Sequence, residues 1–382
     1  MNKSKQIKAM FFNDSNKLQD YATHSMFRYF GKLPPTLVRR ILDENNIHKN
    51  KKVLELMCGS GTTLVECNIR GTSAVGVDVN PLSVLVSKVK NTYIPLNELL
   101  AAQQSIENEI HIIGEEQNDY FRPTTKNLDY WFTEPIQNDL SSLKYLIDNT
   151  ERFINNEAYV QDIKDLFLVT FASIIRKVSN ASPKTGRIFR MPEDNTCNVY
   201  ETYFKKLHTN IYSIQDLPHV NPIQLLQADA RDTGIDDQKF DLIINHPPYF
   251  ALYKYSSDVM RFELEWMNFN RRQIAKNEIE DGFKTTKEEL LDVYIEDMKN
   301  VFVEAKRLLN KEGKLCVVVS DSTLREKQLP VVSKLIEAAS EVGLNLDEHF
   351  LREVAFTQAS YHKSANPNIK TNEDHLMYFT GK

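Results

Sequence analysis

Residues 52–90 alternate between apolar runs and helical stretches in an order that few folds accommodate. The apolar run at residues 53–56 is followed by the turn CGSGTT, a helical stretch and a second apolar run at residues 73–79. Asn80 is a candidate helix cap, and Pro81 suits the first turn of the next helix. Strand, turn, helix, strand and helix in this order start a parallel sheet, so we predict an α/β fold.

The same pattern returns after residue 219. Apolar runs at residues 223–230 and 240–245, a helical stretch at residues 288–310 and the run GKLCVVVSDS predict three more strands. The runs LIIN and LCVVV do not alternate with polar residues, which is typical of central strands covered on both faces. A final helix and two terminal strand candidates, one of them HLMYFTG, bring the expected sheet to about seven strands.

Residues 96–219 differ from both flanks. Helical patterns such as residues 140–154 and 160–178 predominate there, and strand signals are few. The second pattern has a broad apolar face that must pack against another part of the fold. Its members are Ile163, Leu166, Phe167, Val169, Phe171, Ile174 and Ile175. We therefore expect one α/β domain made of residues 1–95 and 220–382, with residues 96–219 as a helical insertion.

The charge distribution bears on the partner. The 382 residues include 47 Lys or Arg and 52 Asp or Glu, for a net charge of -5. Residues 1–52 nevertheless hold eleven basic and four acidic residues, and residues 176–190 hold five basic residues and no acidic one. Two basic patches on an acidic protein permit a nucleic-acid partner.

Short apolar runs and scattered cysteines exclude several classes of protein. The longest apolar runs, such as residues 315–319, fall far below the ~20 residues of a membrane span. The amino-terminal residues lack the apolar stretch of a secretory signal, so we expect a cytoplasmic protein with no membrane contact. No CxxC spacing occurs, so we expect neither a metal site nor a disulfide framework. The cysteines are Cys58, Cys67, Cys197 and Cys316.

The turn at residues 55–63 favours a nucleoside-like ligand. Its two glycines let the backbone pass close to a ligand at the carboxyl end of a strand. Leu64 stands where a dinucleotide-binding turn has a third glycine, and the chain has no GxxxxGK[ST] phosphate loop. Asp78 ends the second strand, where a carboxylate can accept hydrogen bonds from both ribose hydroxyls.

A second motif, DLIINHPPYF at residues 241–250, ends a predicted strand in two prolines and an aromatic residue. Proline removes backbone donors and stiffens the chain where a loop must form. Such a loop holds carbonyl groups and an aromatic face rigidly at the end of the sheet.

The two motifs together resemble those of the S-adenosylmethionine-dependent amino-methyltransferases, especially those that methylate exocyclic amines of DNA bases. The usual family forms are DPFCGSGTT and a loop of Asp, Asn or Ser followed by PP and an aromatic. Residues 23–35 are similar to the upstream segment that holds the methionine end of the cofactor, and residues 253–269 resemble the region after the proline loop in cytosine-N4-type members. The resemblance implies a Rossmann-like, seven-stranded methyltransferase sheet with S-adenosylmethionine as cofactor.

The chain departs from the family forms at three places. Glu55 replaces the commoner Asp, Leu56 and Met57 replace Pro and Phe, and His246 stands at the position of Asp, Asn or Ser. A neutral imidazole can still accept a hydrogen bond through one nitrogen.

The resemblance implies two sets of site residues. Cofactor contacts fall on Phe27, Tyr29, Glu55, Cys58, Gly59, Gly61, Thr62, Thr63, Asp78, Val79, Asp229 and Ala230, with Asp229 at the adenine amine. Catalysis falls on Asn245, His246, Pro247, Pro248 and Tyr249.

We expect the His246 side chain and the Pro247 carbonyl to accept the two N–H groups of the target amine, and Tyr249 to stack on the base. His246 can also take the amine proton after methylation. The base must leave its duplex stack to reach this site. The reaction needs neither a metal nor a covalent intermediate.

The expected substrate is double-stranded DNA, with cytosine N4 preferred to adenine N6 because of the likeness at residues 253–269. The helical insertion at residues 96–219, with its basic run at residues 176–190, and residues 253–283 are alternative recognition regions. A restriction endonuclease or another defence component is an expected partner. Guanine N2 in RNA, glutamine amides in proteins and a catalytically idle cofactor-binding module remain open as alternatives.

Overall fold

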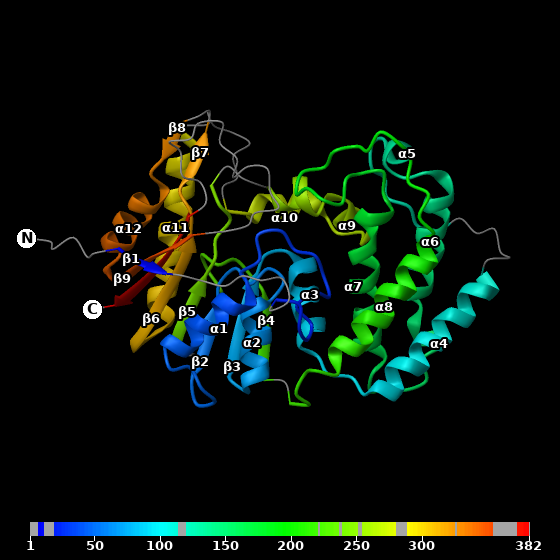
Figure 1. Ribbon diagram of the computed structural model, residues 1–382, viewed down its shortest axis with the longest axis horizontal. Coiled ribbons are helices and arrows are strands. Elements are labelled where there is room, and N and C mark those ends of the chain that lie inside the picture. The colour runs from blue at the N-terminus through cyan, green and yellow to red at the C-terminus, as the bar shows by residue number, and fades with distance from the viewer. Residues whose placement is uncertain are drawn as a thin grey trace, which may run out of the picture.

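The chain folds into an α/β sheet with a group of helices beside it, and a computed structural model describes most of the residues. Figure 1 shows the sheet and its covering helices in the left half of the molecule and helices α4 (Leu96–Ile113), α6 (Glu134–Asp148), α7 (Val160–Val178) and α8 (Val199–Ile214) in the right half. The described residues are 7–10, 19–113, 120–220, 222–236, 239–250, 254–279, 289–324, 327–353 and 373–381.

The main sheet has eight strands in the order β1-β9-β10-β6-β5-β2-β3-β4. They are β1 (Lys8–Met10), β2 (Lys52–Glu55), β3 (Ser73–Asp78), β4 (Ile223–Gln227), β5 (Phe240–Asn245), β6 (Leu309–Val319), β9 (Leu344–Glu353) and β10 (Glu373–Gly381). Strands β6, β5, β2, β3 and β4, which are neighbours in this order, are all parallel to one another. Strand β10 is antiparallel to both of its neighbours. The predicted seven-stranded Rossmann-like sheet is confirmed, with β1 as an additional short edge strand.

The strand order reverses at β2. From β2 the chain goes to β3 and β4 on one side and later returns to β5 and β6 on the other. Open α/β sheets bind ligands at the carboxyl ends of the strands at such a reversal, because the loops there diverge and leave a crevice. The turn after β2 and the proline loop after β5 both lie at this place.

Alternating residues of the central strands supply two separate cores. Val53 and Cys316 belong to the core under α1 (Pro35–Glu44) and α2 (Thr62–Arg70). Their neighbours Leu54 and Leu315 belong to the core under α11 (Glu289–Leu308) and α12 (Val331–Glu341). Because both faces are covered, these strands carry apolar residues at successive positions.

A third core joins the helices of residues 96–219 to α3 (Pro81–Asn91). Helix α7 contacts α3, α6, α8 and α9 (Arg261–Trp266), and its predicted apolar face is buried. The short helix α5 (Leu128–Trp131) also lies in this region, and α10 (Arg271–Asn277) follows α9.

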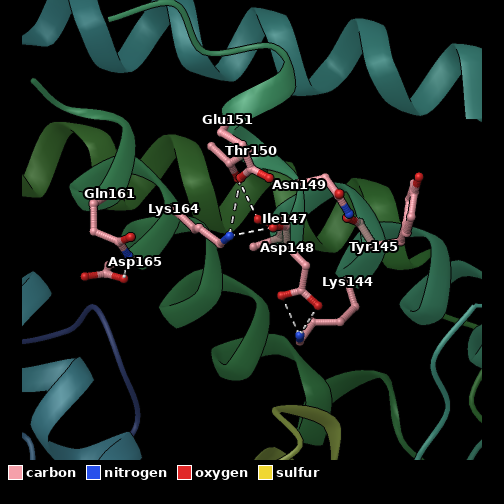
Figure 2. Close-up of polar contacts among 10 residues, drawn as sticks. All are labelled: Lys144, Tyr145, Ile147, Asp148, Asn149, Thr150, Glu151, Gln161, Lys164 and Asp165. Atoms are coloured by element: carbon pink, nitrogen blue, oxygen red, sulfur yellow. Dashed lines mark hydrogen bonds and ion pairs between the residues drawn. The ribbon is translucent and has the colours of Figure 1, made fainter. Parts of the chain in front are cut away.

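Polar contacts fix the sharp reversal between α6 and α7, as Figure 2 shows. Lys144 binds the carboxylate of Asp148, and Lys164 reaches back to the Asp148 carbonyl and to Glu151. The Thr150 hydroxyl donates to the Ile147 carbonyl at 2.7 Å. These bonds satisfy backbone carbonyls that the end of α6 leaves without a helical partner.

The helical region leaves the sheet and returns to it at nearly the same point. The Gln215 side chain, at the end of α8, donates to the carbonyl of Ile94, which precedes α4, at 3.1 Å. The rings of Tyr93 and His219 stack with their centroids 4.1 Å apart. The entry and the exit of this region are therefore in direct contact.

No helix in the described ranges combines the length and apolar character that crossing a bilayer requires. All four cysteines carry free thiols; Cys197 is exposed and the other three are buried.

Candidate active site

A cavity of about 360 Å³ opens at the carboxyl ends of β2, β3, β4 and β5. Its volume lies in the range usual for small-molecule sites, about 300–1,000 Å³. Eleven of the predicted site residues line it: Tyr29, Glu55, Cys58, Gly59, Thr62, Asp78, Val79, Asp229, Ala230, His246 and Pro248. The fold thus brings together segments that are far apart in the sequence.

Six predicted residues are not part of the cavity lining: Phe27, Gly61, Thr63, Asn245, Pro247 and Tyr249. Phe27 is buried in the helical core, and Gly61 caps the start of α2. Asn245 is fully buried at the end of β5, and neither polar atom of its amide has a hydrogen-bond partner in the part of the chain that the structure describes.

The glycine turn requires residues without a side chain. Gly59 and Gly61 have φ angles of 49° and 70°, in the left-handed region. A Cβ on Gly59 would lie 3.0 Å from the Tyr29 ring, and one on Gly61 would lie 2.6 Å from Ser87 Oγ. The turn therefore combines a left-handed backbone with close approach by neighbouring side chains.

Asp78 is held in a fixed orientation by the backbone. Its Oδ2 accepts from the Gly59 N–H at 2.8 Å, and its Oδ1 accepts from the Asn80 N–H at 2.9 Å. Burial raises the pKa of this carboxyl to about 6, against the effect of the two backbone bonds. Each carboxylate oxygen can accept a further hydrogen bond, so Asp78 can bind two hydroxyl groups of a ligand in the cavity.

Glu55 presents a buried carboxyl group to the same cavity. Its side chain is almost fully buried, and burial raises its pKa to about 8. Among the described residues, its Oε2 atom has no hydrogen-bond partner. A buried carboxyl oxygen without a partner is costly, and a cationic ligand group beside it would remove that cost.

The upstream segment covers the glycine turn. The Tyr29 ring stacks on Tyr255 with centroids 5.5 Å apart, and its hydroxyl lies 3.2 Å from Ser83 Oγ. The Tyr255 hydroxyl donates to the Phe30 carbonyl at 3.0 Å. The Thr23 hydroxyl donates to the carbonyl of Lys90 at 2.7 Å, which ties the segment to α3. Residues 23–35 thus form one wall of the cavity.

His246 and Pro248 bring the proline loop to the cavity. Burial lowers the pKa of His246 to about 4, so the imidazole is neutral at physiological pH. The Tyr249 hydroxyl donates to Asp374 Oδ1 at 2.8 Å. The stacking of its ring on a base stays a prediction. The His246 and Tyr249 rings meet edge to face at 88°, with their centroids 5.4 Å apart.

Asp229 lines the cavity but is paired with a neighbour. Both of its oxygens accept from Arg231, at 2.6 to 3.1 Å, and Arg231 also binds Asp297 at 2.6 Å. The carboxylate is therefore fixed beside the cavity, at the turn after β4.

The structure adds lining residues that the sequence reasoning did not assign to the site. Tyr255 and Glu278 follow the proline loop, and Arg187 comes from the loop between α7 and α8. Arg187 had a signal in the sequence, because it belongs to the basic run at residues 176–190. Tyr255 and Glu278 fall within residues 253–283, the alternative recognition region of the sequence analysis, but no motif marked either residue individually.

No family model matches the chain. Sequence comparison finds similarity to Type II methyltransferases. The chain is 27% identical to M.MvaI of Kocuria varians over 248 residues, which are 59% of this chain and 53% of that protein. It is 24% identical to M.BsoBI of Geobacillus stearothermophilus, covering 69% of this chain and 55% of that protein. It is 20% identical to M.MjaII of Methanocaldococcus jannaschii, covering 84% of this chain and 76% of that protein.

The chain spans about half the length of the first two of these relatives. Among solved structures, a TehB-like SAM-dependent methyltransferase from Corynebacterium glutamicum has a TM-score of 0.34 at 11% identity, covering 90% of this chain and 87% of that one. TrmN from Thermus thermophilus has a TM-score of 0.35 at 10% identity, covering 92% of this chain and 49% of that one. The sequence relatives confirm the resemblance to DNA methyltransferases that the two motifs predict.

Proposed function

We propose that this chain transfers a methyl group from S-adenosylmethionine to an exocyclic amine of a DNA base. The premise is that its curated relatives are Type II DNA methyltransferases. One observation carries the proposal: the glycine turn with Asp78 and the proline loop with His246 line a single cavity. We further propose that cytosine N4 is the preferred acceptor and adenine N6 the second.

The cavity residues fit the cofactor. The unpartnered Oε2 of Glu55 suits the ammonium of the methionine end, and a cation there would favour the ionised carboxylate despite its burial. Asp78 is proposed to bind the ribose hydroxyls, and Asp229, which lines the same cavity, is proposed to accept from the adenine amine. When bound, S-adenosylmethionine supplies an electrophilic methyl group on a positively charged sulfur.

His246 is the proposed hydrogen-bond acceptor for the target amine. The lone pair of an exocyclic amine is delocalised into the ring, so hydrogen bonds that hold its N–H groups favour a more nucleophilic nitrogen. A neutral imidazole accepts one such bond, and the Pro247 carbonyl is proposed to accept the other. The N–C bond forms as the C–S bond breaks, and His246 takes the proton that the amine loses.

The helical insertion at residues 96–219 is the proposed recognition region. Arg176 donates to the carbonyls of Ser182, Thr185 and Arg187, and this fixes the basic loop. Arg187 itself lines the cavity, and Phe189 is 56% exposed on the same loop. A cation at the mouth of the site suits the phosphates beside a flipped base.

The alternative region, residues 253–283, has acidic residues among its basic ones, whereas residues 176–190 have none. Residues 254–279 of it are described, and Tyr253 and Phe283 lie outside the described residues. Arg261 and Arg271 both pair with Glu265 at 3.3 Å. Arg190 of the first region also pairs with a carboxylate, that of Asp194, so the absence of acidic residues within residues 176–190 is what makes the first region the better candidate. The Type II designation of the relatives supports a restriction endonuclease as a functional partner.

The test is mass spectrometry of nucleosides from genomic DNA of cells that overexpress the protein, with empty vector and Asp78→Ala as controls. We expect new N4-methylcytosine, or N6-methyladenine, only with the unaltered protein. DNA without either base would contradict the proposal. Methylated RNA or protein would then identify one of the other acceptors, and cofactor binding without methylation would identify an idle module.

A further inference from the structure

A chain of polar contacts leads from His246 away from the cavity to strands β9 and β10. His246 Nε2 lies 3.4 Å from the Tyr249 oxygen, and the Tyr249 hydroxyl donates to Asp374 Oδ1 at 2.8 Å. Asp374 Oδ2 accepts from Arg352 Nη1 at 2.6 Å. These contacts join the proline loop to the carboxyl-terminal part of the sheet.

The Asp374–Arg352 end of this series of polar contacts is rigid and charged. Asp374 on β10 and Arg352 on β9 are directly opposite each other in the antiparallel ladder. They are 7% and 5% exposed, so their ion pair is protected from water. Removing either partner would leave the other charge buried without compensation. Both oxygens of Asp374 are therefore hydrogen-bond acceptors, one for Tyr249 and one for Arg352.

The acceptor oxygens of Asp374 determine which group donates in each of the other hydrogen bonds. A phenol has one hydrogen, and the Tyr249 hydrogen goes to the Asp374 carboxylate because a charge-assisted bond is the stronger one. The Tyr249 oxygen can then only accept at its contact with His246. His246 must accordingly carry its hydrogen on Nε2, which leaves Nδ1 with a lone pair.

We infer that Tyr249, Asp374 and Arg352 are positioning residues that hold His246 as the Nε2–H tautomer, with Nδ1 as the acceptor for the target amine. The role of Nδ1 rests on the proposed function. The tautomer itself rests only on the contacts among these four residues. In the opposite tautomer, lone pairs on Nε2 and on the Tyr249 oxygen would face each other at 3.4 Å.

Two charged groups beyond Tyr249, Asp374 and Arg352, affect the pKa of the His246 ring. Asp374 favours a protonated imidazole and Arg352 disfavours it, so their effects on the pKa oppose each other. Burial, the larger cause, keeps the ring neutral. A neutral ring has one donor and one acceptor nitrogen, and the contact with Tyr249 decides which is which.

The tautomer can be measured on the full chain by ¹⁵N NMR of histidine-labelled protein, since the two ring nitrogens differ in shift and coupling. The chain has nine histidines, and a His246→Asn spectrum identifies the signals of His246. We expect a pure Nε2–H pattern in the unaltered protein. Tyr249→Phe and Asp374→Asn should each introduce the Nδ1–H form, and two variants guard against a folding failure in one.

Tyr378→Phe is the matched control, because Tyr378 is a buried tyrosine on the same strand as Asp374 but belongs to a different core from the one that Tyr249 packs against. It should leave the His246 signals unchanged. An Nδ1–H pattern in the unaltered protein, or signals that Tyr249→Phe and Asp374→Asn leave unchanged, would overturn the inference.

Methylation assays separate this inference from the proposed function. Tyr249→Phe should lower kcat on DNA about 2- to 10-fold with no change in the KM for S-adenosylmethionine, because the acceptor nitrogen is lost in part of the molecules. An unchanged kcat together with a changed tautomer would refute the role of Nδ1. A pure Nε2–H signal in a protein that methylates no DNA would refute the proposed function and leave the tautomer assignment in place.

Discussion

Replacing Gly61 by alanine tests whether the cofactor turn is shaped by backbone geometry alone or also by close packing. At a φ of 70°, any side chain costs about 1–2 kcal/mol. The new Cβ would also lie 2.6 Å from Ser87 Oγ and 3.3 Å from Ser87 Cα, and overpacking of this kind costs about 1–3 kcal/mol. We therefore expect Gly61→Ala to lower the free energy of unfolding by about 2–5 kcal/mol.

Gly234→Ala provides the matched control. Gly234 has a φ of 67°, but among the described residues no heavy atom lies within 4 Å of its Cβ position. Only the backbone cost of about 1–2 kcal/mol should appear there. Urea denaturation of both variants, followed by circular dichroism, measures the difference. Equal losses in the two variants would refute the packing argument, because Ser87 would then have moved aside at no cost.

Three further predictions concern the cavity. Asp78→Asn should weaken S-adenosylmethionine binding about 10-fold in calorimetry, since a charged acceptor of two hydroxyl hydrogens becomes a neutral one; unchanged affinity would place the ribose elsewhere. The contribution of His246 to kcat should be constant from pH 8 to 6 and be lost only as the pH falls toward the His246 pKa of about 4, because the protonated ring cannot accept a hydrogen bond. A midpoint near the ordinary pKa of histidine would contradict the buried neutral imidazole. Arg187→Ala should weaken DNA binding and lower the slope of log K against log salt by about 1, whereas Lys299→Ala, on α11 and outside the proposed recognition region, should do neither.

The sheet and the cofactor half of the site could be predicted because their signals are local. The turn at residues 58–63 and Asp78 follow two adjacent parallel strands directly, so the strand ends alone bring them to one edge. His246 follows β5, which pairs with β2 on the other side, and the same reasoning places it nearby. None of these placements depends on a contact between distant side chains.

The remaining features depend on long-range register. Asp374 meets Arg352 because β10 and β9 pair with these two residues opposite each other, and no short pattern in the sequence encodes that alignment. The phenol hydroxyl of Tyr249 is directed to this pair, a contact that the family motif did not suggest. Arg231 likewise takes both oxygens of Asp229, a pairing to which the motif reasoning gave no weight.

The contact between Ile94 and Gln215 makes the helical region a replaceable cassette. Since its two ends are joined by a hydrogen bond and by the stacked rings of Tyr93 and His219, the sheet needs only a short link at that point. A different helical cassette could be grafted there if it covered the sides of α3 and α9 that pack against the present one, among them Val86 and Phe262. On the proposed function, exchange of the cassette at this junction would change the DNA sequence that is read and would retain the groups proposed for the chemistry.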